Sequence, residues 1–281
     1  MSTGRYSGIL VELVRGARVA PLTAFTCFAC LVVTAGAWLE GGAEPESWEH
    51  MARWGALSGP DIWEGRIWGL LTSVFVHGDL LHLVFNVYWL WTFGLVLERV
   101  LPRVALLGLL VAAGVVSSAA ELAVTGDPGI GVSGVLYAWF GVLWSARRAV
   151  PSFAAALDQR TIGLFLVWLV VCIVATHLEY WNIGNAAHLG GLLFGVGVGP
   201  SFLPGRWRAQ ARAATVIGSA GVLVAAFWCP WNAEWTFQRA IRQHERGELE
   251  QAERSYRRSL EQGVEPERAW GALAYLAQAA D

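Results

Sequence analysis

Lysine is absent from the 281-residue sequence, so all 20 basic residues are arginine. Charged residues of either sign are also few: they make up 15% of the chain, against about 25% in a typical soluble domain. Hydrophobic residues make up 55%, and the mean hydropathy is +0.46. This composition predicts an integral membrane protein. The formal net charge of −2 argues against nucleic acid as a partner.

Two sequence signatures of hydrolases are missing as well. There is no H-E-x-x-H motif and no other histidine pair at helical metal-ligand spacing, so we predict no metal site. The G-x-S-x-G motif would need glycine at position 135, where the sequence has Val135. The four cysteines lie within apolar runs, and Cys27-x-x-Cys30 has no second ligand pair nearby, so we interpret them as packing thiols.

Seven apolar runs approach the roughly 20 residues that a helix needs to cross a bilayer. They are residues 20–39, 80–97, 104–124, 129–146, 161–178, 186–204 and 212–231. Residues 40–79, between the first two runs, contain four tryptophans and predict an insert at the membrane interface, where tryptophan prefers to lie. Residues 232–281 are charged, favour helix and contain no span.

Arginine placement orients these spans. Arginines lie before the first run, after the second, between the fourth and fifth, and between the sixth and seventh, whereas the loops TGDPG and HLEYWNIG have none. Arginine-rich loops stay in the cytoplasm, which predicts a cytoplasmic N-terminus and, with seven spans, an extracytoplasmic C-terminus. No small-residue cleavage site precedes the first run, so we expect no removed signal peptide.

Four polar residues share one depth within the predicted spans. The second, fourth and sixth spans run inward, so the four lie in the first turns at the outer end: His82, Asn86, Ser133 and His188. A polar group inside a span is costly and indicates function by default. The alternative is a structural cluster, with interhelical hydrogen bonds worth about 0.6–2 kcal/mol each. Two interpretations of Glu121, in the third span, stay open: its side chain reaches water, or it accepts a bond from a neighbouring helix.

Small residues form a stripe along each of two spans. One stripe is His188, Gly191, Gly195 and Gly199, and the other is Gly134, Ala138 and Gly141. Small faces let helices approach closely, so contact between the stripes would bring His188 within hydrogen-bond reach of Ser133. A serine beside a histidine is the arrangement of an activated nucleophile. His82 and Asn86 share a helix face and can both donate hydrogen bonds to an oxyanion. No aspartate lies at this depth on these spans, which predicts a dyad.

Three motifs resemble those of the rhomboid intramembrane proteases. Gly131-Val132-Ser133-Gly134, followed by Tyr137, Ala138 and Gly141, is similar to the family's serine motif. The stretch HGDLLHLVFN, with His77, His82 and Asn86, is similar to its H-x-x-x-x-H-x-x-x-N motif. Ala187-His188 with Gly191 and Gly195 is similar to its A-H-x-x-G-x-x-x-G motif. The motifs occur in the family's order, and the similarity covers about residues 60–204.

The resemblance implies an all-α membrane protein with a six-helix core at residues 20–204. It implies Ser133 as nucleophile, His188 as general base, and His82, Asn86 and the Ser133 backbone N–H as an oxyanion hole, with Tyr137 stacked on His188. Gly131, Gly134, Gly191 and Gly195 are supporting residues, and we expect His77 to hydrogen-bond loop backbone in the insert. The implied substrates are transmembrane proteins cut near the outer face, without metal or cofactor, in a multi-pass protein of the bacterial inner membrane.

The chain departs from the family pattern at several points. Trp68 is followed by Gly69, where the family often has arginine. Gly94 and Glu98 match the first two positions of a G-x-x-x-E-x-x-x-G motif, but Pro102 takes the place of its last glycine. These departures bear on how the insert is anchored. The remaining segments are a cytoplasmic stretch at 1–19, a linker and seventh transmembrane helix at 205–231, and the C-terminal segment at 232–281.

The C-terminal segment resembles part of a tetratricopeptide repeat, with Gly247, Ala252 and Tyr256 in matching positions. We expect Phe237 and Ile241 to pack on it from the preceding helix, and Trp270 and Leu273 from the next. Such repeats normally need about three units for stability, and only about one and a half are present. Two interpretations therefore stay open: a hairpin packed on itself or the membrane, and a module that binds a peptide or protein.

Three classes of function were weighed. A rhomboid-type serine protease accounts for the dyad and the His82–Asn86 pair together. A catalytically silent rhomboid-like membrane binding protein is the alternative. A transporter is disfavoured, because its site would lie at the membrane midplane and this polar cluster is shallow.

Overall fold

Residues 15–41, 48–203, 205 and 207–280 are described by the computed structural model. Most of the predicted N-terminal segment at 1–19, and residues 42–47 of the predicted insert, lie outside these ranges. Every helix or turn of helix in the described ranges is α or 3-10, and no strand occurs among them. The all-α prediction is therefore confirmed for this part of the chain.

The long helices follow the predicted apolar runs closely. They are α2 (Pro21–Gly41), α6 (Leu80–Val100), α7 (Arg103–Thr125), α8 (Ser133–Ala146), α10 (Gln159–His177), α11 (Asn185–Val198) and α12 (Trp207–Phe227). Five helices are long and apolar enough to cross a membrane, namely α2, α6, α7, α10 and residues 208–227 of α12. These helices indicate an integral membrane protein, as the composition predicts.

The fourth and sixth runs are shorter as helices than predicted. The helices α8 and α11 each contain 14 residues, about 21 Å of helix against a hydrocarbon core of roughly 30 Å. Residues 126–132 form a loop before α8, and α11 gives way to the 3-10 turn η2 (Gly199–Phe202), where Pro200 follows the cap residue Gly199. Since α8 begins only at Ser133, this residue lies at the helix start and not four residues into it.

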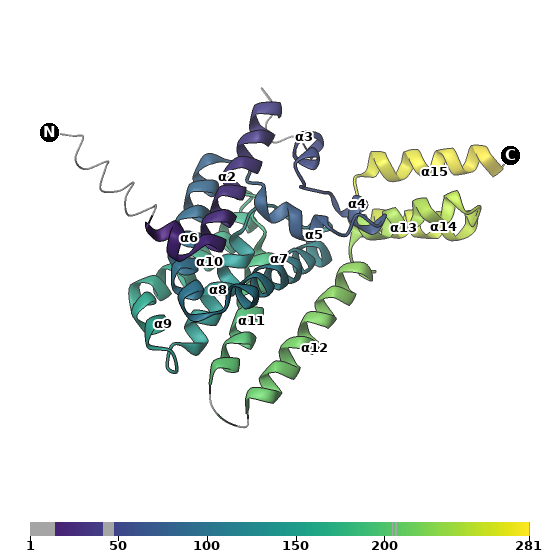
Figure 1. Ribbon diagram of the computed structural model, residues 1–281. Helices are drawn as coiled ribbons and strands as arrows, with labels where there is room; N and C mark the ends of the chain where they lie inside the picture. Colours follow the sequence, from purple (N-terminus) through teal and green to yellow (C-terminus); the bar gives the residue numbers. More distant parts are fainter. Residues whose placement is uncertain (1–14, 42–47, 204, 206, 281) are drawn as a thin grey trace.

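Helix α8 lies at the centre of the bundle (Figure 1). Eleven of its 14 residues are buried, and it packs against α11, α7 and α6. The main apolar core surrounds it and includes Trp139, Phe140, Phe93 and Phe165, with Cys27 and Cys30 of α2 among its members. Both cysteines are buried and free, as packing thiols require.

The insert between α2 and α6 is a series of short helices. They are α3 (Trp48–Arg53), α4 (Gly59–Trp63), α5 (Gly69–Thr72) and the 3-10 turn η1 (Ser73–Phe75). Trp48 and Trp68 are exposed, whereas Trp63 is partly buried and donates its Nε1–H to the carbonyl of Ala226 at 2.8 Å. The insert is thus tied to the end of α12.

The C-terminal segment forms three helices, α13 (Ala233–Glu245), α14 (Leu249–Glu261) and α15 (Pro266–Ala280), with a small core of their own. Phe237, Ile241 and Leu273 pack there as predicted. The prediction for Trp270 is wrong: its side chain is 54% exposed. The inward face of α15 runs through Ala269, Leu273 and Leu276 at helical spacing, and Trp270 points away from that face.

This three-helix unit projects from the end of α12 beside the bundle (Figure 1). The chain entering it is attached to the C-terminal end of α7, where Trp231 Nε1 donates to the Ala123 carbonyl at 2.8 Å and Asn232 Nδ2 to the Val124 carbonyl at 3.1 Å. The last carbonyls of a helix have no partner within it, so these two side chains satisfy them from outside. The unit therefore docks next to the loop that leads to Ser133.

Candidate active site

The loop before α8 positions Ser133 through contacts with distant parts of the chain. Gly131 has φ +94°, which favours glycine, and a Cβ there would lie 2.6 Å from the His82 ring. Its N–H donates to the Ser73 carbonyl at 3.2 Å, and the next N–H, of Val132, donates to His77 Nε2 at 3.4 Å. No side chain caps α8. The backbone N–H groups of its first turn, which begins at Ser133, therefore have no partner within the helix.

The small-residue stripes of α8 and α11 meet as predicted. A Cβ on Gly191 would overlap the Gly134 carbonyl, and a Cβ on Gly195 would overlap the Ala138 carbonyl. From the other side, a Cβ on Gly141 would lie 2.7 Å from the Leu192 carbonyl oxygen. Each added Cβ would meet backbone atoms of the other helix, so the main chains of α8 and α11 are in direct contact along these stripes.

This approach brings Ser133 and His188 together. His188 Nε2 lies 2.8 Å from Ser133 Oγ, and the histidine is 5% exposed. The ring of Tyr137 lies against the imidazole, with centroids 4.7 Å apart and planes inclined by 33°, and the Tyr137 hydroxyl donates to the Phe165 carbonyl at 3.1 Å. No residue in the described ranges bonds His188 Nδ1, the position that a triad carboxylate would take.

His82 and Asn86 lie on the first turns of α6. Asp79 caps this helix by accepting the His82 backbone N–H at 2.8 Å. The His82 ring lies next to Gly131 of the loop before α8. Asn86 is 1% exposed, and within the described part of the chain neither its Nδ2 nor its Oδ1 has a hydrogen-bond partner. A buried amide without a partner is costly, and such groups occur where a ligand or reacting atom supplies the partner.

His77 holds the loop and faces no open space. It is fully buried, and burial, with a smaller contribution from neighbouring His82, lowers its pKa to about 3, so the ring is neutral at physiological pH. Nε2 accepts the Val132 N–H, which leaves the proton on Nδ1, within 3.3 Å of the Phe75 carbonyl in the insert. Thr34 Oγ1 of α2 lies 3.2 Å from the same nitrogen, a contact that sequence reasoning missed because Thr34 has no motif around it.

Glu121 does not reach water: it is 4% exposed and accepts the Ala187 N–H of α11 at 2.8 Å. Of the two alternatives left by the sequence, the structure therefore has the bond to a neighbouring helix.

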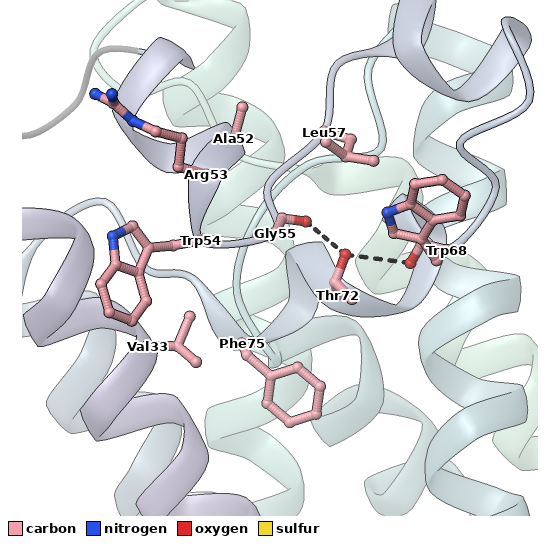
Figure 2. Close-up of a pocket in the computed structure, with 9 residues that line it drawn as sticks. All are labelled: Val33, Ala52, Arg53, Trp54, Gly55, Leu57, Trp68, Thr72 and Phe75. Atoms are coloured by element: carbon pink, nitrogen blue, oxygen red, sulfur yellow. Dashed lines mark hydrogen bonds between the residues drawn. The ribbon is translucent and has the colours of Figure 1, made fainter.

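One cavity lies away from this site. It measures about 380 Å³ and sits between α2 and the insert (Figure 2), where Thr72 Oγ1 donates to the Gly55 carbonyl at 2.6 Å. Neither Ser133 nor His188 lines it, so it is separate from the serine–histidine pair. In the described ranges no group of three or more His, Cys, Asp or Glu side chains is arranged to hold a metal ion.

Comparison with known proteins points the same way as this geometry. A family model described as the rhomboid domain matches residues 64–205, half of the chain. The chain belongs to the rhomboid family. It is 28% identical over 181 residues to the rhomboid protease GlpG of Salmonella paratyphi A, a match that covers 64% of this chain and 62% of that protein. It is 31% identical over 133 residues to the rhomboid protease GlpG of Yersinia pseudotuberculosis serotype I, covering 47% and 46%.

The chain thus spans less than two thirds of the length of these curated relatives. The matched residues of the family model contain all three motifs and the serine–histidine pair, whereas α13–α15 lie beyond them.

Proposed function

We propose that this protein is an intramembrane serine endopeptidase that cleaves transmembrane proteins near the outer membrane face with a Ser133–His188 dyad. The observation that carries the proposal is the 2.8 Å contact between Ser133 Oγ and His188 Nε2 inside a packed apolar bundle. A purely structural serine–histidine pair would not require a buried, unpartnered amide on the helix that carries His82, so Asn86 favours catalysis over a silent fold. A fluorophosphonate probe, which phosphonylates an activated serine, tests the assignment directly.

In the proposed mechanism Ser133 Oγ attacks the carbonyl carbon of the scissile peptide. His188 Nε2 takes the serine proton and then delivers it to the leaving amine nitrogen, so the C–N bond breaks and an acyl-enzyme ester forms. Water, deprotonated by the same nitrogen, hydrolyses the ester and restores Ser133. With no carboxylate on Nδ1, the packing of α11 and the Tyr137 ring keep the imidazole in place.

The negative oxygen of the tetrahedral intermediate is assigned to three donors: Asn86 Nδ2, the His82 ring and the Ser133 backbone N–H. Donors aimed at the developing charge stabilise the transition state more than the ground state. The N-terminus of α8 adds the positive end of a helix dipole at the same point. The inferred site needs neither metal nor cofactor.

We expect Asn86→Ala to lower kcat about 10²- to 10³-fold with little change in KM, because an oxyanion donor acts mainly in the transition state. Cleavage of a reporter transmembrane substrate by protein reconstituted in liposomes measures this. Thr92→Ala, on the same helix but with its hydroxyl donating to the Tyr88 carbonyl, is the control and should keep wild-type kcat. Unchanged kcat in the Asn86→Ala, His82→Ala double variant contradicts the assignment.

We further propose that α12 is a seventh transmembrane helix, which puts the N-terminus in the cytoplasm and α13–α15 outside the bacterial inner membrane. Residues 208–227 meet the length and hydropathy for a span, and Trp228 lies at their end, as interface aromatics do. The contacts of Trp231 and Asn232 with the end of α7 support a location beside the loop that leads to Ser133. There the three-helix unit could hold the outer part of a substrate and raise its local concentration.

A reporter fused after Asp281 tests this topology. We expect an enzyme that works only in the periplasm to be active there and a fluorophore that works only in the cytoplasm to be dark, because the charge-free stretch of α12 crosses the bilayer. The same fusions after Arg148, in an arginine-containing loop, are the control with the opposite expected pattern. A cytoplasmic pattern after Asp281 removes both the seventh span and the substrate-holding role.

A further inference from the structure

Glu121 is a buried carboxylate in the outer half of α7 without a cationic partner. It is 4% exposed, and none of the ion pairs among the described residues includes it. A buried charge is strongly destabilising unless hydrogen bonds compensate it. The hydrogen bonds that the Glu121 carboxylate oxygens accept are therefore what stabilises this residue in its buried position.

Its partner is the start of α11. The cap residue of this helix is Gly184, which has no side chain to bond the free N–H groups of the first turn. Glu121 Oε2 accepts one of them, the Ala187 N–H, at 2.8 Å. A Cβ on Gly184 would lie only 3.3 Å from the same oxygen, so the glycine leaves room for the carboxylate. Glu121 thus caps α11 from a different helix.

The capped residue immediately precedes His188. Because His188 Nδ1 has no partner among the described residues, the position of this imidazole depends on the α11 backbone and on the Tyr137 ring packed against it. The Gly191 and Gly195 contacts set the distance between α11 and α8, and the Glu121 bond fixes the end of α11 against α7.

The same side chain also lies beside the loop that leads to Ser133. A Cβ on Gly129 would lie 3.4 Å from Glu121 Cγ, and Gly129 has φ +71° in the stretch between Gly126 and Ser133. One residue is therefore bonded to the segment that carries His188 and lies close to the segment that carries Ser133. We propose that Glu121 is a positioning residue that aligns His188 with Ser133 through the backbone of α11. This inference rests on the proposed protease function.

Glu98 provides a matched control. It is likewise a buried carboxylate that caps another helix: its oxygens accept the Leu22 and Thr23 N–H groups of α2, each at 2.9 Å. Unlike Glu121, it also accepts the Thr23 hydroxyl at 2.8 Å and pairs with Arg103 at 3.5 Å. It lies twelve residues after Asn86 on α6, at the opposite end of that helix from the site. Replacing Glu98 therefore removes the same kind of cap without touching the segments around Ser133.

The test compares kcat, KM and the thermal unfolding midpoint of reconstituted wild-type protein and four variants. E121L should lower kcat about 10²-fold at nearly constant KM, because a displacement of about 1 Å of a catalytic group has an effect of this size. E121Q, which keeps an acceptor oxygen, should restore most of kcat. E121D, one methylene shorter, should fall between them. E98L should lower the unfolding midpoint at least as much as E121L, because Glu98 makes more bonds, but it should keep kcat.

Several outcomes overturn the inference. These are wild-type kcat in E121L, an equal loss of kcat in E98L and E121L, or a change confined to KM. Wild-type kcat in E121D overturns it even if E121L does not fold. If the wild-type protein shows no Ser133-dependent turnover, the proposed function fails and this inference fails with it, whereas the other outcomes leave the proposed function intact.

Discussion

Ser133→Ala is expected to abolish labelling by a fluorophosphonate probe and to lower substrate cleavage on the order of 10⁴- to 10⁶-fold. The side chain supplies the only atom assigned to form the covalent bond, and alanine leaves His188 Nε2 without the proton it is positioned to accept. His188→Ala should show a loss of similar size, because members of such a pair act as a unit and their effects are not additive.

Purified protein in detergent, labelled and separated by electrophoresis, measures the first effect, and cleavage of a reporter transmembrane substrate measures the second. Ser145→Ala is the matched control: this serine is on the same helix, and its hydroxyl donates to the Gly141 carbonyl at 2.7 Å. It should label like the wild type. Labelling that persists in Ser133→Ala defeats the nucleophile assignment, whereas a wild-type protein that does not label favours a silent rhomboid-like binding protein.

Gly191→Leu or Gly195→Leu should reduce kcat about 10²-fold or more by separating His188 from Ser133. The added side chain meets the carbonyl of Gly134 or Ala138, and main chain cannot rotate away as a flexible side chain would. Bulk in a well-packed contact typically destabilises by about 1–3 kcal/mol, so activity should fall further than stability. Even alanine should have an effect, because the overlap begins at Cβ.

Activity assays and thermal unfolding of the same preparations separate the two effects. Gly163→Leu is the control, since Gly163 is a helical glycine of α10 with no atom within 4 Å of its would-be Cβ. It should leave both quantities near wild type. Wild-type kcat in Gly191→Leu would show that the close approach of α8 and α11 is not what aligns the pair.

The sequence by itself determined the class of protein and led to the residues that we propose as reactive. An apolar run long enough to cross a bilayer forms a helix whatever its neighbours are, because a helix bonds its backbone N–H and C=O groups within the segment. The helices α2, α6, α7 and α10 therefore lie within a few residues of their predicted limits. The prediction of His82, Asn86, Ser133 and His188 needed only their presence in apolar surroundings, where polar groups are costly. The spacing of the glycines indicated which faces of α8 and α11 could meet, and the structure has these faces in contact.

Only the tertiary structure decided where α8 begins, what Glu121 bonds and where the C-terminal helices dock. Ser133 is the first residue of α8 because the loop before it is bonded to His77 and Ser73, more than fifty residues earlier in the chain. Glu121 accepts a bond from Ala187, and Asn232 donates one to Val124, across separations of 66 and 108 residues. Periodicity and composition report only on neighbours along the chain, whereas these bonds depend on how whole helices pack and on which helix ends the packing leaves without partners.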